Sequence, residues 1–352
     1  MGKVLMKGNE AIAEAAIRSG CRLYFGYPIT PQNEICAYMS RQMPKENGLY
    51  LQAESEIAAI NMVMGAAGAG ARVMTSSSSP GISLKTEGIS YIAAGDLPCV
   101  IVNVQRGGPG LGTIQPAQAD YNQATKALGH GDFRVIVYSP STVQEMVDCT
   151  FEAFDRADEY RIPVLILIDG LLGQMMEPVE FPDRETVQPI KTWAVTGHGN
   201  RREHNVINTL CLQADMLEKK ILERYRRYEL IEQNETKAEA YLCDDAELVI
   251  VAYGASSRIA RSAVDSARKA GVKAGLLKPL TLWPFPEKQI REHTKNAGHI
   301  LTVEMNMGQM VHDVRSTVEY KTPVSFYGRT GGVIPTPTEI CDEVIKITGG
   351  KR

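Results

Sequence analysis

The feature that most constrains the fold is a series of short, nearly continuous apolar runs, each followed by a stretch with helical spacing. In the first half of the chain these runs are residues 22–25, 49–52, 72–75, 100–105, 134–138 and 164–168. Strands rich in Val, Ile and Leu are typical of parallel sheets that helices cover on both faces. The alternation resumes at residue 246, with apolar runs at 248–253, 272–277, 299–305 and 324–327. We therefore predict an α/β protein with two doubly wound, mostly parallel domains.

Length and local composition suggest where these domains begin and end. A chain of 352 residues is long enough for about two domains. Residues 203–242 form a charged stretch with helical spacing and no Gly or Pro, which predicts a long helix. We predict a first domain at residues 1–180, a linker with this helix at 181–245, and a second domain at 246–352. The helix fits a solvated arm, a subunit contact or a tether between the domains, and we favour the tether.

Two short segments of the predicted second domain allow alternative interpretations. Residues 254–257, GASS, precede or open a predicted helix, so they provide either an ordinary N-cap at Ser256 or Ser257 or a place for an anion. Residues 282–286, LWPFP, interrupt any helix and carry two aromatic rings. They form either a plug in the core or an interface.

The segment YPITP at residues 27–31 lies between an apolar run and a stretch with helical spacing. Its two prolines fix their own φ angles and push the residues before them, Tyr27 and Thr30, towards extended geometry. The segment is therefore a rigid elbow at the carboxyl end of a predicted parallel strand, where open α/β sheets bind ligands. By itself the spacing fits a plain connection as well as a site that uses the Thr30 hydroxyl.

Three further segments place chemically active groups at the ends of predicted elements. Glu54 and Glu56 begin an Ala- and Gly-rich helical stretch, and four serines precede Pro80-Gly81. Arg106 ends an apolar run and is followed by glycines, whose backbone can approach a ligand closely. A guanidinium in this position suits a carboxylate, although an ion pair within the fold is the alternative. No GxGxxG motif is present, which argues against nucleotide binding.

Charge and the distribution of metal-binding residues exclude several functions. The net charge of −3 and pI near 6.1 argue against a nucleic-acid or membrane-surface partner. No apolar run has the length of a membrane span and the N-terminus lacks a signal-peptide core, so we predict a cytoplasmic protein. The seven cysteines include no CxxC pair, which excludes a locally encoded iron–sulfur cluster or zinc site. His130, in the turn GHGD, is predicted to be structural.

An ordered set of motifs carries a resemblance to a known family. The motifs are YPITP at 27–31, QAESEIAA at 52–59, TSSSSPGISL at 75–84, QRGGPGLG at 105–112, GHGD at 129–132 and LLKPLTLWPFP at 276–286. Together they resemble the α-type subunit of 2-oxoacid:ferredoxin oxidoreductases, over essentially the whole chain. Within that family the sequence is most similar to subunits assigned to 2-ketoisovalerate, a branched-chain 2-oxoacid.

The resemblance implies the identity of the domains and the roles of several residues. Residues 1–180 would be the pyrimidine-binding domain of a thiamine diphosphate enzyme, and residues 246–352 a transketolase-C-like domain. A glutamate would contact the aminopyrimidine ring nitrogen and stabilise the imino tautomer that activates the thiazolium carbon. Alignment on Ser-Glu selects Glu56, with Glu54 in reserve. The remaining implied cofactor contacts are Tyr27, Pro28, Ile29, Ser78 and Ser79.

The resemblance also implies how the substrate is held. Thr30 would hydrogen-bond the 2-oxoacid or its adduct, and Arg106 would pair with the 2-oxoacid carboxylate. Relatives that act on 2-oxoglutarate often read GPST after this arginine, whereas the present sequence reads GPGL, ending at Leu111. The loss of two hydroxyls predicts a less polar pocket, which suits an aliphatic side chain better than a second carboxylate.

Missing motifs imply partner chains. The usual GDG motif for the metal-bound diphosphate is absent, because Asp169-Gly170 lacks the leading Gly. The resemblance therefore implies a β-type subunit that holds the diphosphate and Mg²⁺, a γ-type subunit, and a ferredoxin-like subunit that carries 4Fe-4S clusters. It also implies coenzyme A as acyl acceptor and external ferredoxin as electron acceptor, with no metal held by this chain.

Three alternative functions remain open from the sequence. The first is the same reaction on 2-oxoglutarate or pyruvate. The second is the β subunit of a lipoate-linked branched-chain 2-oxoacid dehydrogenase, against which YPITP and RGGPG argue. The third is a non-catalytic scaffold subunit, in which Thr30, Glu56 and Arg106 would be dispensable for turnover.

Overall fold

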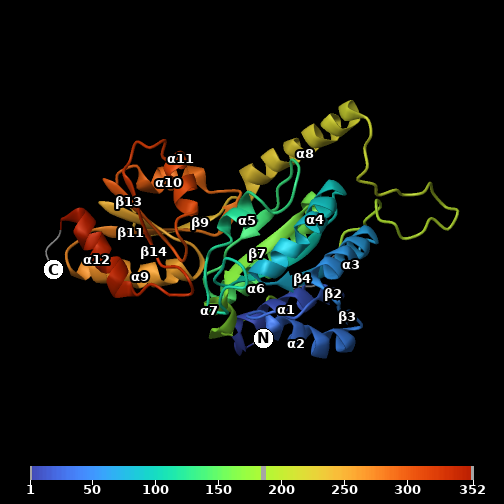
Figure 1. Ribbon diagram of the computed structural model, residues 1–352, viewed down its shortest axis with the longest axis horizontal. Coiled ribbons are helices and arrows are strands. Elements are labelled where there is room, and N and C mark those ends of the chain that lie inside the picture. Colours follow the sequence, from blue (N-terminus) through green and yellow to red (C-terminus); the bar gives the residue numbers. More distant parts are fainter. Residues whose placement is uncertain (1, 184–187, 350–352) are drawn as a thin grey trace.

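The computed structural model describes residues 2–183 and 188–349, and its core contains two sheets (Figure 1). The larger, N-terminal sheet has the strand order β12-β6-β7-β5-β4-β2-β3. Its strands are β2 (Leu23–Gly26), β3 (Leu49–Gln52), β4 (Val73–Ser77), β5 (Cys99–Gln105), β6 (Ile136–Tyr138), β7 (Pro163–Asp169) and β12 (Thr281–Trp283). The first six pair in parallel, and β12 pairs antiparallel with β6. The six strands predicted from the first half of the sequence are confirmed.

Helices cover both faces of the N-terminal sheet, whose central strands β5 and β7 are mostly apolar. All seven residues of β5 and of β7 are buried. Helices α3 (Glu56–Gly68) and α4 (Ser79–Ala94) pack against each other, as do α1 (Gly8–Arg18) and α6 (Val143–Tyr160). The remaining helices of this unit are α2 (Asn33–Gln42), the 3₁₀ turn η1 (Met43–Glu46), α5 (Tyr121–Thr125) and α7 (Gly170–Gln174).

The order of strands in the N-terminal sheet creates a natural ligand-binding position. Strand β2 lies between β3 and β4. The chain therefore runs from β2 to β3 on one side of β2, and then returns across to β4 on the other side of β2. Open α/β sheets bind ligands outside the carboxyl ends of their strands at such a reversal. The elbow at 27–31 follows β2, Glu56 follows β3, and the serine-rich turn follows β4. The topology therefore brings three of the candidate motifs to the same edge of the sheet.

The C-terminal sheet has the order β14-β13-β10-β11-β9. Its strands are β9 (Ala238–Tyr241), β10 (Leu248–Val251), β11 (Ala274–Pro279), β13 (His299–Glu304) and β14 (Val324–Gly328). All pair in parallel except β9, which lies antiparallel at the edge. Its helices are α9 (Gly254–Lys269), α10 (Glu287–Thr294), α11 (Met310–Thr317) and α12 (Pro337–Thr348). Helices α9 and α12 pack together on one face, and α10 and α11 lie on the other (Figure 1). The predicted class, α/β with two mostly parallel sheets, is confirmed.

Two strand pairings join distant parts of the chain. Strands β1 (Val4–Lys7) and β8 (Met176–Val179) form a small antiparallel sheet. Strand β12, from the LWPFP region, extends the N-terminal sheet, and Leu282 and Trp283 are buried there. The Trp283 ring packs edge-on against Tyr228. This region is therefore part of the core, as one of its two interpretations predicted.

The charged helix is shorter than its sequence pattern predicted. Helix α8 covers Ala214–Asn234, whereas residues 203–213 are not helical and residues 238–241 form β9. Residues 205–209, NVINT, have low helix propensity, and the Asn205 side chain donates to the carbonyl oxygens of Thr192 and Ala194. Strand β9 forms because its backbone pairs with β11. Within the described ranges, no helix is long and apolar enough to cross a membrane.

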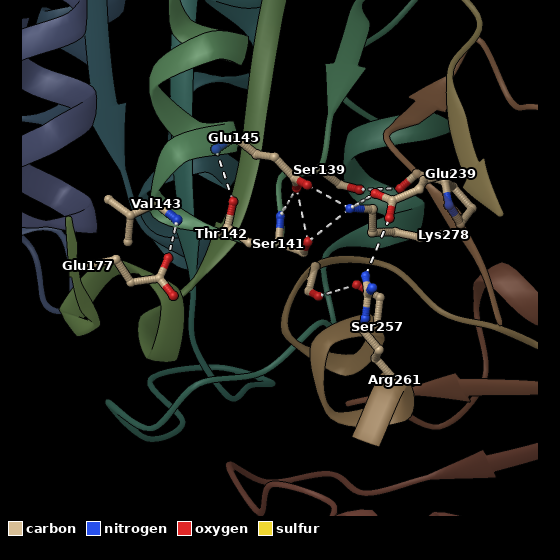
Figure 2. A network of polar contacts seen from close by, with 12 residues as sticks. Ser139, Ser141, Thr142, Val143, Glu145, Glu177, Glu239, Ser257, Arg261 and Lys278 are labelled. Carbon is tan, nitrogen blue, oxygen red and sulfur yellow. Dashed lines mark hydrogen bonds and ion pairs between the residues drawn. The ribbon is translucent and has the colours of Figure 1, made fainter. Parts of the chain in front are cut away.

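Buried polar contacts hold the two sheet units together. Gln118 donates from Nε2 to the Tyr253 carbonyl oxygen at 2.8 Å and accepts from Ser256 Oγ at 2.6 Å. Lys278 of β11 forms ion pairs of 2.6 Å with Glu145 of α6 and Glu239 of β9 (Figure 2). Ser256 is thus engaged with Gln118.

The start of α9 is not an open anion site. The helix begins at Gly254, earlier than predicted, and Tyr253 is the N-cap residue, without a side-chain cap bond. Asp169, at the end of β7, accepts a hydrogen bond from the backbone of Ala255. The N-terminal turn of α9 therefore already has a carboxylate partner, and neither serine serves as its N-cap.

Candidate functional site

Glu56 is the first residue of α3 and lies at the reversal of strand order. Ser55 caps the helix, because its hydroxyl accepts a hydrogen bond from the Ala58 backbone at 3.2 Å. The helix therefore begins at Glu56, whose side chain is buried with 6% of its surface exposed, whereas Glu54 is exposed. Residues two apart at a helix start face different directions. Of the two glutamates, Glu56 is the one that the fold directs into the site.

The Glu56 carboxylate lies against the first turn of α4. A Cβ atom placed on Gly81 would be 2.6 Å from Glu56 Oε1 and 2.1 Å from Ser77 Oγ, so any larger residue there would force these side chains to move. The carboxylate accepts no hydrogen bond from the residues that the structure describes. A helix N-terminus favours negative charge, which helps to keep the carboxylate in this position.

Other polar atoms near this edge are also without partners inside the described chain. The hydroxyls of Ser77 and Ser78 and Nε of Arg106 are buried and make no hydrogen bond there. Buried polar groups are nearly always hydrogen-bonded in folded proteins. A group of such atoms beside an unpartnered carboxylate is typical of a site that is completed by a ligand or by another chain.

Arg106 connects the elbow to the glycine-rich loop. Its Nη1 donates to the carbonyl oxygen of Thr30 at 3.0 Å, and its Nη2 donates to that of Leu111 at 3.0 Å. The residue is buried, and it forms no ion pair with the described residues. Both bonds go to backbone carbonyls, so they leave the positive charge without a carboxylate partner. The guanidinium is therefore suited to an anionic group from outside the chain.

The elbow itself is held from beneath by Gln32. Gln32 Nε2 donates to the Tyr27 carbonyl oxygen at 3.1 Å, while Ser76 Oγ donates to Gln32 Oε1 at 2.5 Å. Thr30 is half-buried, and its hydroxyl accepts from Asn33 Nδ2 at 3.2 Å. Tyr27 and Pro28 are exposed, and Ile29 is half-buried. The backbone of the elbow is thus fixed while several of its side chains remain accessible.

Ser79 and Asp120 form a support that sequence reasoning missed. The Ser79 hydroxyl donates to Asp120 Oδ2 at 2.6 Å and accepts from the Arg106 backbone at 3.1 Å. Asn103 Nδ2 also donates to Asp120, at 2.9 Å. Burial raises the pKa of Asp120, although these two hydrogen bonds oppose the shift. Ser79 is therefore occupied in positioning Arg106, and no local motif marks Asp120 in the sequence.

A largely apolar cavity of about 600 Å³ adjoins the elbow. Its lining includes Thr30, Pro31, Ile114, Leu171, Met175 and, from the C-terminal unit, Ile334. Leu111, predicted to contact substrate, is 85% exposed and does not line the cavity. Ile114, which follows the glycine-rich loop, does line the cavity.

The other sequence candidates have structural partners. Burial raises the pKa of Asp169 to about 6, against hydrogen bonds from the backbone amides of Leu172 and Leu171. His130 Nδ1 lies 3.1 Å from Ser90 Oγ, and its ring meets Tyr91 edge-on. Among residues 2–183 and 188–349, no group of His, Cys, Asp and Glu side chains could hold a metal ion.

Two family models match the chain. The thiamine diphosphate-binding model of pyruvate flavodoxin/ferredoxin oxidoreductases matches residues 14–239, and the model of pyruvate:ferredoxin oxidoreductase core domain II matches residues 246–340. The chain belongs to the pyruvate flavodoxin/ferredoxin oxidoreductase family. Membership confirms the resemblance to α-type subunits of 2-oxoacid:ferredoxin oxidoreductases that the motifs predicted.

Relatives in this oxidoreductase family cover nearly the whole chain. Ketoisovalerate oxidoreductase subunit VorB of Methanothermobacter thermautotrophicus is 49% identical, over 99% of each chain. The 2-oxoglutarate synthase subunit KorA of the same organism is 36% identical, over 97% of this chain and 98% of the relative. A solved 2-oxoglutarate:ferredoxin oxidoreductase from Magnetococcus marinus, with 2-oxoglutarate, coenzyme A and succinyl-CoA bound, superposes with a TM-score of 0.88 at 27% identity. The match covers 98% of this chain and 65% of that one.

The residues of this oxidoreductase chain are chemically suited to the aminopyrimidine ring of thiamine diphosphate. The unpartnered Glu56 carboxylate and the buried hydroxyls beside it offer polar groups to an aminopyrimidine ring. The chain is therefore suited to hold the ring end of the cofactor.

Proposed function

We propose that this chain is a catalytic subunit of a thiamine diphosphate-dependent oxidoreductase that converts a branched-chain 2-oxoacid of the 2-ketoisovalerate type to its acyl-CoA. In this reaction the bond to the carboxyl carbon breaks and CO₂ leaves. The acyl carbon forms a thioester with the sulfur of coenzyme A, and two electrons pass to ferredoxin while one proton is released. The observation that carries the proposal is the buried, unpartnered Glu56 carboxylate at the reversal of strand order.

Glu56 holds and exchanges a proton with the aminopyrimidine ring nitrogen. When bound, thiamine diphosphate supplies the nucleophilic carbon that attacks the 2-oxo group. The position of Glu56 at the start of α3, against Gly81, excludes water from one side of the carboxylate. A carboxyl group in such a setting is effective as an acid or base because its geometry is fixed. Ser77 and Ser78 provide further polar contacts to the ring.

Thr30 and Arg106 orient the 2-oxoacid. The Arg106 guanidinium has no carboxylate partner in the described chain and is fixed by the Thr30 and Leu111 carbonyls, so it can pair with the substrate carboxylate. The Thr30 hydroxyl lies on the same elbow and hydrogen-bonds the substrate. The backbone bond from Arg106 to Thr30 keeps these two groups in one geometry, which is the requirement for orienting a reactant.

Two observations support a branched aliphatic substrate. The cavity beside Thr30 is lined mainly by apolar side chains, including Ile114, Met175 and Ile334. The second carboxylate of a substrate such as 2-oxoglutarate would lose its hydration in this cavity and find no cationic side chain among the lining residues. The ketoisovalerate relative is also more similar than the 2-oxoglutarate relative, at 49% against 36% identity. Activity on 2-oxoglutarate that exceeds activity on 2-ketoisovalerate in the assembled enzyme would contradict this choice of substrate.

Exposed apolar side chains on the elements that carry the site indicate a partner chain. They are Tyr27, Leu51, Ile57, Leu84, Leu111 and Ile114. We assign the covering chain as a β-type subunit that holds the diphosphate and Mg²⁺. A ferredoxin-like subunit would carry the 4Fe-4S clusters, and a γ-type subunit completes the complex. This division leaves the ring end of the cofactor to the present chain.

The test uses the assembled complex with thiamine diphosphate and Mg²⁺. Glu56→Gln should lower turnover of 2-ketoisovalerate with methyl viologen by at least ~100-fold, because it removes an acid–base contact. Arg106→Ala should raise KM more than it lowers kcat, and Thr30→Ala should lower both kcat and kcat/KM. Glu54→Gln, at an exposed neighbouring carboxylate, is the control and should retain wild-type turnover. A loss of less than about tenfold for Glu56→Gln would favour the scaffold alternative.

A further inference from the structure

Three arginines surround one aspartate at the edge of the N-terminal sheet where β5 and β7 begin. The Asp96 Oδ1 atom accepts hydrogen bonds from Arg224 Nε at 3.0 Å and from Arg227 Nη2. The Asp96 carbonyl oxygen accepts from Arg161 Nε at 3.1 Å. Arg224 also donates to the Ala94 carbonyl oxygen at 3.0 Å, which holds α8 beside the end of α4 (Figure 1). A single aspartate therefore serves three guanidinium groups.

These side chains line a cavity of about 420 Å³, a volume typical of small-molecule sites. The charged residues of its lining are the cations Arg161, Lys220, Arg224 and Arg227 and the carboxylates Asp96 and Glu223. Four cations against two carboxylates leave an excess of two positive charges at neutral pH. The cavity is therefore suited to an anion.

The contacts with Asp96 leave much of the hydrogen-bonding capacity of the arginines unused. Among the described residues, these contacts engage one nitrogen of Arg161, two of Arg224 and one of Arg227. Arg227 Nε is buried and makes no hydrogen bond within the described chain. Buried polar atoms without partners are rare in folded proteins. Such an atom on a residue that lines a cavity indicates a partner from outside the chain.

Arg161 is fixed in orientation, but its charge is not balanced. Its guanidinium carbon lies 4.4 Å from the centroid of the Trp193 ring. It forms no ion pair with a carboxylate in the part of the chain that the structure describes. Burial lowers the pKa of Arg161; the Asp96 charge opposes this shift and the Arg227 charge adds to it. An anion in the cavity would relieve the repulsion between these two arginines.

A purely structural role explains only part of this arrangement. The bonds from Arg224 to Asp96 and to the backbone of α4 are enough to fasten α8 to the sheet. Lys220, Arg224 and Arg227 follow one another at spacings of four and three residues, which places them on one face of α8. Lys220 is exposed and has no ion-pair partner among residues 2–183 and 188–349. Its charge therefore remains available to a ligand.

A phosphate group matches this lining. A phosphate monoester carries a charge of about −1.5 to −2 at neutral pH and three strong acceptor oxygens, so it would balance the excess charge. Guanidinium groups that surround one residue can share these oxygens, because all of them belong to one group. A dicarboxylate of the same charge spreads its oxygens over two separate groups. We propose that this cavity binds a phosphate group, carried by inorganic phosphate or by a small phosphorylated metabolite.

The cavity is separate from the candidate site of catalysis. Asp96 precedes β5 and Arg106 follows it, so the seven residues of this strand separate the two by about 20 Å or more. Phosphate binding here is therefore independent of the proposed function. Substitutions at Lys220 and Arg227 should leave turnover of 2-ketoisovalerate unchanged in phosphate-free buffer, which also shows that the variant complexes are assembled.

The test is calorimetric titration of the assembled complex, with thiamine diphosphate and Mg²⁺ bound and excess cofactor removed. The probes are inorganic phosphate, glucose 6-phosphate and succinate, at one ionic strength set with potassium chloride. At least one of the two phosphates should bind with a Kd of about 1 mM or less, and succinate should bind at least about tenfold more weakly. Tighter binding of glucose 6-phosphate would assign the site to a phosphorylated metabolite, and tighter binding of inorganic phosphate would assign it to free phosphate.

Two variants locate the binding within the complex, and each has a control beside it on α8. Arg227→Gln should weaken phosphate binding by at least about tenfold, the effect of losing a hydrogen bond to a charged group. Lys220→Gln should weaken it about two- to fivefold, as expected for one exposed ionic contact. The controls are Arg226→Gln and Lys219→Gln, which remove the same charge from exposed residues that do not line the cavity. Both controls should bind phosphate as wild type does.

Several outcomes would overturn the proposed phosphate site. These are wild-type complex that binds neither phosphate, binding that Arg227→Gln and Lys220→Gln leave unchanged, and equal weakening in the controls, which would be an effect of net charge. Succinate that binds as tightly as phosphate would overturn the choice of phosphate. If Arg227→Gln does not assemble, Lys220→Gln decides, because Lys220 is exposed. Loss of turnover in Glu56→Gln with normal phosphate binding would bear on the proposed function alone.

Discussion

Glu56 and Gly81 lie next to each other where α3 and α4 begin, and a side chain at residue 81 would collide with the Glu56 carboxylate in its present position. A Cβ atom on Gly81 would lie 2.6 Å from Glu56 Oε1, well inside van der Waals contact. The same atom would lie 2.1 Å from Ser77 Oγ, which is buried and without a partner in the described chain. The glycine therefore sets how closely α4 approaches the carboxylate.

Gly81→Ala should displace Glu56 and weaken thiamine diphosphate binding by at least about tenfold. Added volume in a closely packed site forces neighbours to move, at a cost of about 1–3 kcal/mol. Here the groups that can move are the Glu56 carboxylate and the Ser77 hydroxyl. Calorimetric titration of the assembled complex with thiamine diphosphate and Mg²⁺ measures the affinity, and thermal unfolding measures stability.

Gly65→Ala is the matched control for this change. Gly65 lies within α3, is exposed, and a Cβ atom there would meet nothing within 4 Å. Alanine should stabilise the helix by about 0.5–1 kcal/mol and leave cofactor affinity at the wild-type value. Equal cofactor affinities for the two alanine variants would contradict the role of Gly81.

Asp120→Asn should loosen Arg106 through Ser79. The carboxylate accepts hydrogen bonds from Ser79 Oγ and Asn103 Nδ2. In asparagine the amide NH₂ group cannot accept a hydrogen bond, so any of these donors that faced it would lose its acceptor. Loss of one such buried bond costs about 1–3 kcal/mol. Because Ser79 holds the Arg106 backbone, KM for the 2-oxoacid should rise about tenfold while kcat changes less.

A conservative change elsewhere isolates the effect of Asp120. Asp148→Asn alters an exposed carboxylate on α6 that accepts a hydrogen bond from Gln144. It should change stability by less than about 0.5 kcal/mol and leave KM unchanged. A KM that is also unchanged in Asp120→Asn would show that Ser79 holds Arg106 without help from Asp120.

Local patterns predicted the parallel strands of both sheets because these strands are mostly apolar, but they missed β9, which lay within the predicted charged helix. They also indicated the elbow, the start of α3 and the glycine-rich loop, each of which depends on nearby prolines, glycines or caps. The position of β12 was not predictable in this way, because residues 281–283 pair with residues 137–138 across the chain. Asp120 and Lys85 were missed for the same reason, since their partners become neighbours only after folding.

Lys85→Met should stabilise the protein at pH 7. Burial lowers the folded-state pKa of Lys85 from 10.5 to about 8, so the unfolded chain binds more protons between these values. Stability therefore rises with pH across this window, and the penalty for the buried charge is greatest below pH 8. The gain at pH 7 should be about 2 kcal/mol, after about 1 kcal/mol is lost because the Thr75 hydroxyl loses its partner.

The pH dependence gives the decisive measurement for Lys85→Met. Chemical denaturation of wild type and variant at pH 7, 9 and 10.5 should show a stability difference that shrinks as pH rises. Above pH 10.5 both folded and unfolded lysines are neutral, so the charge contribution disappears. A difference that stays constant with pH would mean that packing, and not the buried charge, accounts for it.

Lys278→Met tests the contact between the two sheet units (Figure 2). Lys278 Nζ lies 2.6 Å from Glu145 Oε1 and 2.6 Å from Glu239 Oε2, and only 9% of its side chain is exposed. Burial opposes ionisation of Glu145, but the hydrogen bonds from Lys278 and Ser141 outweigh it and lower the pKa of Glu145. Removal of the lysine leaves this half-buried carboxylate without its cation, which should cost about 2–4 kcal/mol at pH 7.

The double variant Lys278→Met/Glu145→Gln should recover part of this loss, because it removes the uncompensated charge. A coupling energy of at least about 1 kcal/mol is expected from the double-mutant cycle at pH 7. Glu145 has a lowered pKa, so its contribution is present above pH 4.5 and is lost as pH falls through the folded value. The coupling should therefore shrink below pH 4.5.

Lys346→Met, in an exposed pair with Glu343, should change stability by less than about 0.5 kcal/mol. If the coupling were as small as this control, the domains would be held by Gln118 and the β12 pairing and not by the ion pair.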